Sequence, residues 1–364
     1  MKFITTTKNL DLFIDEIIAD DTGHYIALDT EFVRINTYWP QLCLVQIAGS
    51  KQAAIIDCLA ENIDLTPLKK LLYTPDIIKV LHSARQDLEI FYKLFEEVPY
   101  PLFDTQVADS FCGDSESIGF ERIAEKLLSR SIDKTCQFTD WAQRPLSSQQ
   151  IEYALNDVVY LREIYEILRS DLVNLSRLEW VYEESERMYM AESFIVDPAK
   201  SWKRVKSSNK DARFWARVKE LAAWREQESQ RKNVNRGKIM KDDVLSNLCL
   251  TDINNPLDII KIIGLPSQYK TPEYIEIFTQ MLKNADSTPG ADCPNKFIHG
   301  HLTGMQKEKL KEILNHADEI AKELNVPRSL LGNKDDIIKM MLTGKNQKLQ
   351  KGWRKEVFTQ KVFG

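Results

Sequence analysis

Residues Tyr25-Ile26-Ala27-Leu28-Asp29-Thr30-Glu31-Phe32 form a short apolar run that ends in two acidic residues. Four consecutive apolar residues predict a buried strand. Side chains two positions apart on a strand point to the same face, so Asp29 and Glu31 can reach one common site. The stretch therefore predicts a buried strand that carries a pair of carboxylates at its end.

Two further acidic residues follow other regular segments of the chain. Asp87 comes after the strand-like run 77–81 and begins a stretch with apolar residues at helical spacing, so we expect it near the start of a helix. Tyr153 and Asp157 lie four positions apart in the helical pattern of residues 150–161, which places both side chains on one helix face. We expect all four carboxylates to converge at one edge of a sheet, with the Tyr153 phenol beside them.

Four clustered carboxylates indicate a site for divalent metal ions. Mg²⁺ prefers a few carboxylates, water and substrate phosphate to a closed protein cage, and the ligand types do not distinguish it from Mn²⁺. Four acids suit two ions, which in two-metal hydrolysis lie about 3.5–4 Å apart and activate the attacking and leaving oxygens. Without cations the carboxylates repel one another, so we expect some to be protonated. The predicted metal ligands are Asp29, Glu31, Asp87 and Asp157, and Tyr153 is expected to orient the attacking water.

The motifs around these residues resemble those of ribonuclease D, a family in the tyrosine subclass of the DEDD exonuclease superfamily, and the resemblance covers nearly the whole chain. The matching segments are Leu28-Asp29-Thr30-Glu31-Phe32-Val33-Arg34, His82-Ser83-Ala84-Arg85-Gln86-Asp87-Leu88, and Asp140-Trp141-Ala142-Gln143-Arg144-Pro145-Leu146 leading into Tyr153 and Asp157. The resemblance implies an α/β ribonuclease H-like exonuclease domain with a mixed central sheet and flanking helices. It also implies metal-dependent 3′→5′ release of nucleotides from RNA.

Each motif taken alone has a more ordinary interpretation. A carboxylate pair at a strand end is usually solvated, Asp87 alone is an acid favoured by the helix dipole, and a Tyr-x-x-x-Asp spacing is common on amphipathic helices. The four acids in this order favour the functional interpretation. The positions of the five histidines agree with the tyrosine subclass. The sister subclass has a histidine in place of the tyrosine near the third motif, and this chain has no histidine between residues 83 and 298.

Other polar residues near the motifs are weaker candidates. We expect Asp104 to be a helix N-cap, and for Asp104 or the nearby Asp109 a supporting role beside the second motif is the alternative. Arg34, Gln41 and Lys134 can approach substrate phosphate or the terminal nucleotide, but surface or structural roles explain them equally well. We assign none of them to catalysis.

Length and composition indicate a multidomain protein of ordinary composition. At 364 residues and 42.2 kDa the chain suggests two or three domains. No apolar run is long enough to cross a bilayer, and the first residues lack the apolar core of a signal peptide, so we expect a cytoplasmic protein without a membrane partner. Six scattered cysteines without a C-x-x-C pair argue against structural zinc and against a disulfide framework.

The net charge of −5 is distributed unevenly along the chain. Residues 1–200 carry 19 Lys and Arg against 34 Asp and Glu, whereas residues 201–364 carry 30 against 20. Within residues 201–241, 13 basic residues oppose four acidic ones. An acidic half joined to a basic half predicts a catalytic domain with appendages that hold nucleic acid, because Lys and Arg contacts to phosphate give affinity without sequence preference. A solvated helix face is the alternative explanation for any one charge run.

Composition divides the chain into three predicted domains. Residues 1–200 form the exonuclease domain, and helical patterns between linkers predict a second domain over 210–289 and a third over 295–364. A weak sequence similarity between residues 233–245 and 325–338 indicates two copies of one small helical module. Both modules resemble the HRDC domain, so the resemblance implies two all-α HRDC-type modules. They either bind nucleic acid or protein, or only pack around the catalytic domain.

The sequence predicts a 3′→5′ exoribonuclease whose substrate is RNA with a single-stranded 3′ end. The resemblance points to 3′ maturation of transfer RNA precursors and other small stable RNAs. Two alternatives are a catalytically inactive RNA-binding or chaperone-like protein and an exonuclease that acts on DNA. The chain has no G-x-x-x-x-G-K-[ST] phosphate loop, so we expect no use of ATP. The sequence leaves the oligomeric state open, with a monomer as the expectation.

Overall fold

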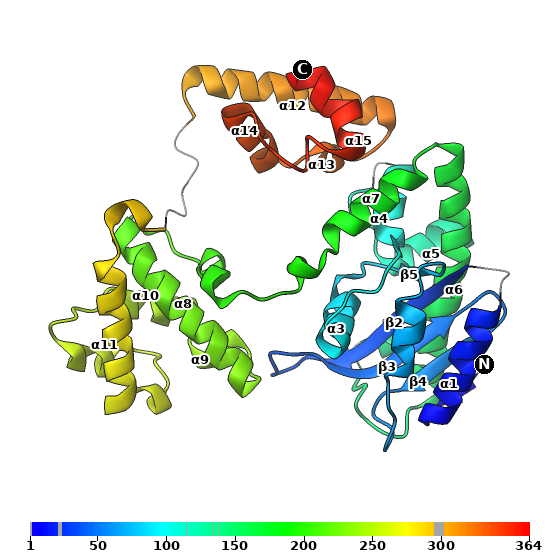
Figure 1. The fold of residues 1–364 in the computed structure, drawn as a ribbon, viewed down its shortest axis with the longest axis horizontal. Coiled ribbons are helices and arrows are strands. Elements are labelled where there is room, and N and C mark those ends of the chain that lie inside the picture. The colour runs from blue at the N-terminus through cyan, green and yellow to red at the C-terminus, as the bar shows by residue number, and fades with distance from the viewer. Residues whose placement is uncertain (1, 21–23, 114, 133, 138, 295–301) are drawn as a thin grey trace. The chain divides into compact units, whose positions relative to one another are not determined.

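The computed structural model describes the whole chain except residues 1, 21–23, 114, 133, 138 and 295–301 (Figure 1). Its contacts divide it into two compact units, which are described separately. The first unit contains residues 1–33, 42–194 and 302–364, and the second contains residues 34–41 and 195–301. The domain start predicted at residue 295 lies outside the described residues, and the other predicted domain boundaries remain predictions.

A six-stranded mixed sheet forms the centre of the first unit, which confirms the expected fold class (Figure 1). Its strand order is β1-β4-β3-β2-β5-β6. The strands are β1 Lys2–Ile4, β2 Tyr25–Val33, β3 Gln41–Ala48, β4 Ala53–Asp57, β5 Ile78–Leu81 and β6 Leu102–Asp104. The pairs β1–β4, β2–β5 and β5–β6 are parallel, and β3 pairs with β4 antiparallel.

Helices cover both faces of this sheet, which is why β2 begins with an unbroken apolar run. Tyr25 and Ala27 pack into the core shared with α4, α5 and α6, whereas Ile26 and Leu28 pack on the opposite face with α1, α2 and α3. Alternate side chains of one strand therefore belong to two different cores. The helices are α1 Thr7–Ala19, α2 Pro67–Leu72, α3 Arg85–Phe95, α4 Thr105–Cys112, α5 Phe120–Leu128 and α6 Ser148–Asn174.

Helix α6 begins at a capping box. The Ser147 hydroxyl accepts a hydrogen bond from the Gln150 backbone N–H, and the Gln150 side chain accepts one from the Ser147 backbone N–H. These two bonds satisfy N–H groups that the first helical turn leaves without partners. The cap fixes the start of the helix that carries Tyr153 and Asp157.

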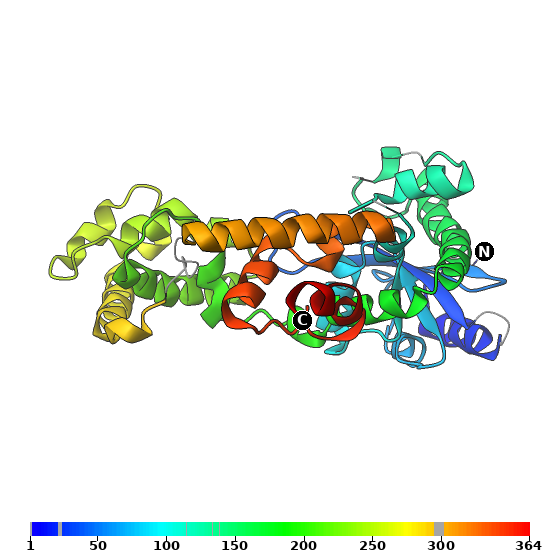
Figure 2. The same cartoon turned by 90° about the horizontal axis from the view of Figure 1, so that it is seen from above.

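The last helical segment of the chain belongs to the first unit. Trp353 is 3% exposed and stacks on Trp180, with ring centroids 4.9 Å apart and planes 13° apart. The buried guanidinium of Arg354 forms an ion pair with the buried carboxylate of Glu184, 2.5 Å apart. The elements here are α7 Leu178–Met188, α12 Gly304–Leu324, α13 Arg328–Leu331, α14 Lys334–Thr343, α15 Gly352–Arg354, a π-helical turn Lys355–Thr359 and α16 Gln360–Phe363. Figure 2 shows α12 as one uninterrupted helix.

The second unit is helical and packs around its own apolar core. Its helices are α8 Ala212–Lys232, α9 Arg236–Ile239, α10 Asp242–Cys249 and α11 Pro272–Ser287. Residues 34–41, which follow β2 and end at the first residue of β3, belong to this unit. The Asn233 side chain accepts hydrogen bonds from the backbone N–H groups of Tyr38 and Trp39 at 3.1 and 3.0 Å, and the Tyr38 hydroxyl bonds to Glu226.

The helical segments that begin with α8 and with α12 have the same order of helices, 92 residues apart. This agrees with the sequence similarity between them. Helix α8 begins at residue 212 and α12 at residue 304, and the short helices that follow begin at residues 236 and 328. Asn233 and Asn325 end the long helices in the same left-handed conformation, with φ of 51° and 50°. In the part of the chain that the structure describes, no helix is both long and apolar enough to span a membrane.

Candidate active site

The end of strand β2 places two carboxylates on one face of the sheet. Asp29 and Glu31 follow Tyr25 and Ala27 at two-residue intervals, so they lie on the face that α6 covers. Oxygen atoms of Asp29, Glu31 and Asp157 all lie within 4.8 Å of one another. The structure thus brings together three of the four carboxylates expected from the sequence.

Helix α6 contributes a carboxylate and a phenol to this group. Asp157 is 7% exposed and accepts a hydrogen bond from the Tyr153 hydroxyl one helical turn earlier. Its Oδ1 atom is buried and has no hydrogen-bond partner among the described residues. A buried carboxylate oxygen without a partner is costly unless a ligand satisfies it. The indole of Trp141 packs near the Tyr153 ring, with centroids 6.1 Å apart.

Asp87 reaches the same end of β2 from the opposite side of the sheet. It lies in the first turn of α3, as expected, and is 7% exposed. The hydroxyl of Thr30 donates a hydrogen bond to Asp87 Oδ1. Because Thr30 lies between Asp29 and Glu31 on the strand, its side chain points to the α3 face. Asp87 is therefore held beside the three-carboxylate group and is not part of it.

The burial and crowding of these carboxylates favour the binding of a cation. Burial first, and then the neighbouring negative charges, raise the pKa of Asp29, Glu31 and Asp87 well above the ordinary range near 4. Burial also raises the pKa of Asp157, although the Tyr153 hydrogen bond opposes this effect. At neutral pH the metal-free site therefore retains protons that divalent cations would displace.

The Tyr153 phenol stays protonated at neutral pH. Burial, followed by the charges of Asp157, Glu31 and Asp29, raises the pKa of Tyr153. A protonated phenol is a hydrogen-bond donor and acceptor. It can therefore orient a small polar ligand beside the carboxylates.

The pairing of Asp57 with Arg144 supports the site and was not predicted from the sequence. The Arg144 guanidinium forms two bonds of 2.7 and 2.6 Å with the buried Asp57 carboxylate at the end of β4. It also donates to the carbonyl oxygens of Cys43 and Trp141. These bonds connect the third motif, residues 140–146, to the sheet next to α6. We call the pairing of Arg144 with Asp57 the clamp. The motif itself contains Arg144, but its partner is 87 residues away in the chain.

The weaker candidates fall in several places. Asp104 is the N-cap of α4, as expected, and Asp109 forms an ion pair with Lys126. Arg34 lies in the loop after β2 and Gln41 is the first residue of β3, and both are grouped with the second unit. The side chain of Lys134 lies outside the described residues.

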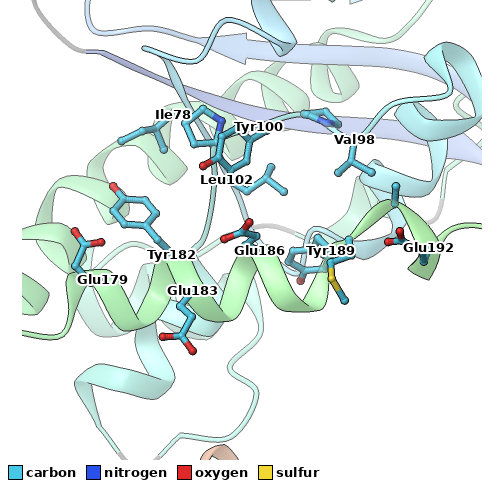
Figure 3. Close-up of a pocket in the computed structure, with 14 residues that line it drawn as sticks. Ile78, Val98, Tyr100, Leu102, Glu179, Tyr182, Glu183, Glu186, Tyr189 and Glu192 are labelled. Atoms are coloured by element: carbon cyan, nitrogen blue, oxygen red, sulfur yellow. The ribbon is translucent and has the colours of Figure 1, made fainter. Parts of the chain in front are cut away.

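A cavity of about 820 Å³ in the first unit is separate from these carboxylates (Figure 3). Its wall includes residues 98–102, which lead into β6, and residues of α7, and none of the five predicted site residues lines it. Four glutamates contribute to the wall, namely Glu179, Glu183, Glu186 and Glu192. Because none of the predicted metal ligands lines it, the cavity is not the proposed metal site.

Comparisons with known proteins agree with this geometry. A family model described as 3′-5′ exonuclease matches residues 1–173, and a model described as HRDC domain matches residues 215–282. The chain is 38% identical to ribonuclease D of Zymomonas mobilis over 346 residues, which cover 93% of this chain and 88% of that protein. It is 36% identical to ribonuclease D of Sphingobium indicum over 359 residues, which cover 98% and 92%.

The fold also matches a crystal structure along its whole length. Escherichia coli RNase D, described as an exoribonuclease involved in structured RNA processing, superimposes with a TM-score of 0.85 at 28% identity. The match covers 99% of this chain and 97% of that chain. The likeness therefore extends over the catalytic and the helical parts of both chains.

Proposed function

This chain belongs to the ribonuclease D family, and on that premise we propose that it is a metal-dependent 3′→5′ exoribonuclease. One observation carries the proposal, the convergence of oxygen atoms from Asp29, Glu31 and Asp157 within 4.8 Å. Asp87 and Tyr153 lie beside this group. This donor set matches the ligand preference of Mg²⁺ and Mn²⁺.

We assign the metal ligands to the four carboxylates and propose two ions, Mg²⁺ or Mn²⁺. Two features support this fit, the buried Asp157 Oδ1 without a partner among the described residues and the raised pKa values of the carboxylates. Bound divalent cations would supply positive charge that offsets the carboxylates and polarises the phosphate and the attacking water. The proposed ligands are Asp29, Glu31, Asp87 and Asp157.

The residues of the chain would then position the reactants. The Tyr153 hydroxyl, one helical turn from Asp157, would orient a water molecule in line with the terminal phosphodiester. The water oxygen bonds to phosphorus, and the bond between phosphorus and the 3′ oxygen of the preceding nucleotide breaks. One proton of the water passes to solvent, and the leaving oxygen takes up a proton. A nucleoside 5′-monophosphate is released, and the shortened RNA ends in a 3′ hydroxyl.

The proposed substrate is RNA with a single-stranded 3′ end, with transfer RNA precursors and other small stable RNAs as the physiological class. The printed description of the Escherichia coli relative, structured RNA processing, supports this choice. The basic segment 201–241 of the second unit supplies Lys and Arg for phosphate contacts. We also propose that the protein acts as a monomer in the cytoplasm.

The test uses purified full-length protein and 5′-labelled single-stranded RNA, with DNA of matching sequence in parallel. Reactions contain Mg²⁺, Mn²⁺ or EDTA, and Asp157→Asn is compared with wild type. As the matched control we choose Asp171→Asn, because this aspartate is exposed on the same helix α6. We expect a ladder that shortens from the 3′ end of RNA, requires metal, is retained in Asp171→Asn and is lost in Asp157→Asn.

Other outcomes point to the alternatives. Equal or faster shortening of the DNA would favour a deoxyribonuclease. RNA binding without any ladder would favour a catalytically inactive RNA-binding protein. A ladder that survives Asp157→Asn would contradict the assignment of the site.

A further inference from the structure

Helix α3, which carries Asp87, lacks a cap from its own sequence. Its N-cap residue is Ala84, whose side chain cannot accept a hydrogen bond, and the residue before it, Ser83, has a left-handed backbone with φ of 57°. The first N–H groups of a helix have no partner within the helix, and a buried helix start needs acceptors from elsewhere. Asp87 lies only three residues after Ala84, so the position of this start determines the position of its carboxylate.

Asp104, from the neighbouring strand β6, holds the two residues that lead into this helix. Its Oδ1 accepts a hydrogen bond from the Ser83 N–H at 3.0 Å, and its Oδ2 accepts one from the Ala84 N–H at 2.9 Å. Asp104 is 1% exposed. The same carboxylate is also the N-cap of α4, where Oδ1 accepts from the Gln106 N–H at 2.8 Å. One carboxylate therefore caps α4 and holds the residues that lead into α3.

Tyr189 fixes the orientation of that carboxylate. Its hydroxyl donates a 2.6 Å hydrogen bond to Asp104 Oδ2, and the residue is 6% exposed at the end of α7. Burial and the Asp104 charge raise the pKa of Tyr189, so the phenol remains a donor. Figure 3 shows Tyr189 in the wall of the cavity formed by α7 and residues 98–102. Both oxygens of Asp104 are occupied by protein donors, so Asp104 is not available as a metal ligand.

We propose that Asp104, oriented by Tyr189, is a positioning residue that fixes Asp87 in the metal-binding geometry. This inference rests on the proposed role of Asp87 as a ligand. The chain of contacts runs from the Tyr189 hydroxyl through the Asp104 carboxylate to Ala84, the N-cap residue of α3. Thr30 holds the Asp87 carboxylate itself from the other side. Residues that orient metal ligands without touching the metal typically change metal affinity or activity by about 10- to 100-fold when they are replaced.

The test compares Asp104→Asn and Tyr189→Phe with a control on the same helix. Asp109 is a fully buried carboxylate of α4 that pairs with Lys126, so Asp109→Asn also disturbs α4 without touching the start of α3. We would measure Mn²⁺ binding by electron paramagnetic resonance, which requires no turnover. We would also measure kcat, KM for RNA, the Mg²⁺ concentration for half-maximal activity, and thermal unfolding.

We expect Asp104→Asn to weaken Mn²⁺ binding and raise the half-maximal Mg²⁺ concentration by about 10- to 100-fold, with KM for RNA unchanged. Tyr189→Phe should act in the same direction by about fivefold, because one hydrogen bond is lost. Asp109→Asn should lower the unfolding temperature and leave metal dependence as in wild type. If Asp104→Asn does not fold, Tyr189→Phe decides the question.

Wild-type metal binding in Tyr189→Phe and in any folded Asp104→Asn would overturn the inference, as would an equal loss in Asp109→Asn. A different result would show that the proposed nuclease function is wrong. In that case wild-type protein would bind Mn²⁺ without shortening RNA, and the binding data would still decide the role of Asp104.

Discussion

At the scale of single residues, the site is defined by charges that the fold brings together at an energetic cost. Burial and then repulsion raise the pKa of Asp29 and Glu31, and burial raises that of Asp157, so in the absence of metal these groups tend to keep their protons. Carboxylates with raised pKa values in a cleft are typical of functional sites. The metal-free protein should therefore become less stable as they ionise.

The first prediction concerns Asp157→Asn without metal. The folded-state pKa of Asp157 lies above its unfolded value near 4, so the stability that this group contributes is complete below pH 4 and is lost as pH rises through the folded pKa. Since Asn resembles the neutral acid, in EDTA it should stabilise the protein by about 1–3 kcal/mol at pH 8 and much less at pH 5. Thermal unfolding of both proteins at both pH values would measure this. A difference between the two proteins that does not change with pH would contradict the account.

The second prediction concerns Tyr153→Phe. The substitution keeps the ring beside Trp141 but removes the hydroxyl that donates to Asp157. We expect kcat to fall about 100-fold, the usual effect of losing one oriented hydrogen-bonding group in an active site, with little change in Mn²⁺ binding. Single-turnover cleavage of labelled RNA is the measurement. A variant with the wild-type rate would remove Tyr153 from the mechanism.

At the scale of secondary structure elements, the sequence predicts what depends on local pattern. The apolar run before Asp29 predicts β2, the helical spacing after Asp87 predicts α3, and the spacing of Tyr153 and Asp157 predicts their shared helix face. It does not predict that Thr30 holds Asp87 across the sheet. It offers a supporting role for Asp104 beside the second motif only as an alternative and does not predict its bonds to Ser83 and Ala84, because both contacts depend on how distant strands pair.

The third prediction concerns Arg144→Lys at the clamp between the third motif and β4. Lysine has a single charged nitrogen and cannot reproduce the two parallel bonds to the buried Asp57 carboxylate. We expect a loss of about 1–3 kcal/mol in the free energy of unfolding, measured by urea denaturation. Arg130→Lys is the control, because its ion pair with Glu163 is much more accessible to solvent, and it should destabilise the protein less than Arg144→Lys does. Equal losses in both variants would argue against the clamp.

At the scale of the whole molecule, the two helical segments have similar patterns but belong to different compact units. The segment 302–364 shares the apolar core of the exonuclease fold, and residues 195–301 form a separate unit with residues 34–41. Sequence patterns predicted the repeated module. They did not predict this division, because it depends on contacts such as Tyr38 with Asn233, which are 195 residues apart.

The fourth prediction concerns Trp353→Ala. Trp353 is buried against Trp180 and Phe111, so its loss would leave a cavity between the last helical segment and the catalytic fold. We expect a loss of about 3–5 kcal/mol in the free energy of unfolding, together with lower nuclease activity at 37 °C. Calorimetry with Trp202→Ala, a half-buried residue of the second unit, as a comparison would show whether the catalytic unit is the one affected. If Trp353→Ala left the unfolding temperature of the catalytic unit unchanged, the last helical segment would not stabilise the catalytic fold.

The most direct test of the central claim is a crystal structure of the protein soaked in Mn²⁺, with anomalous diffraction to locate the ions. We expect one anomalous peak bound by Asp29, Glu31 and Asp157, and a second that involves Asp87. Peaks elsewhere, or no peak at these carboxylates when Mn²⁺ supports cleavage, would contradict the account.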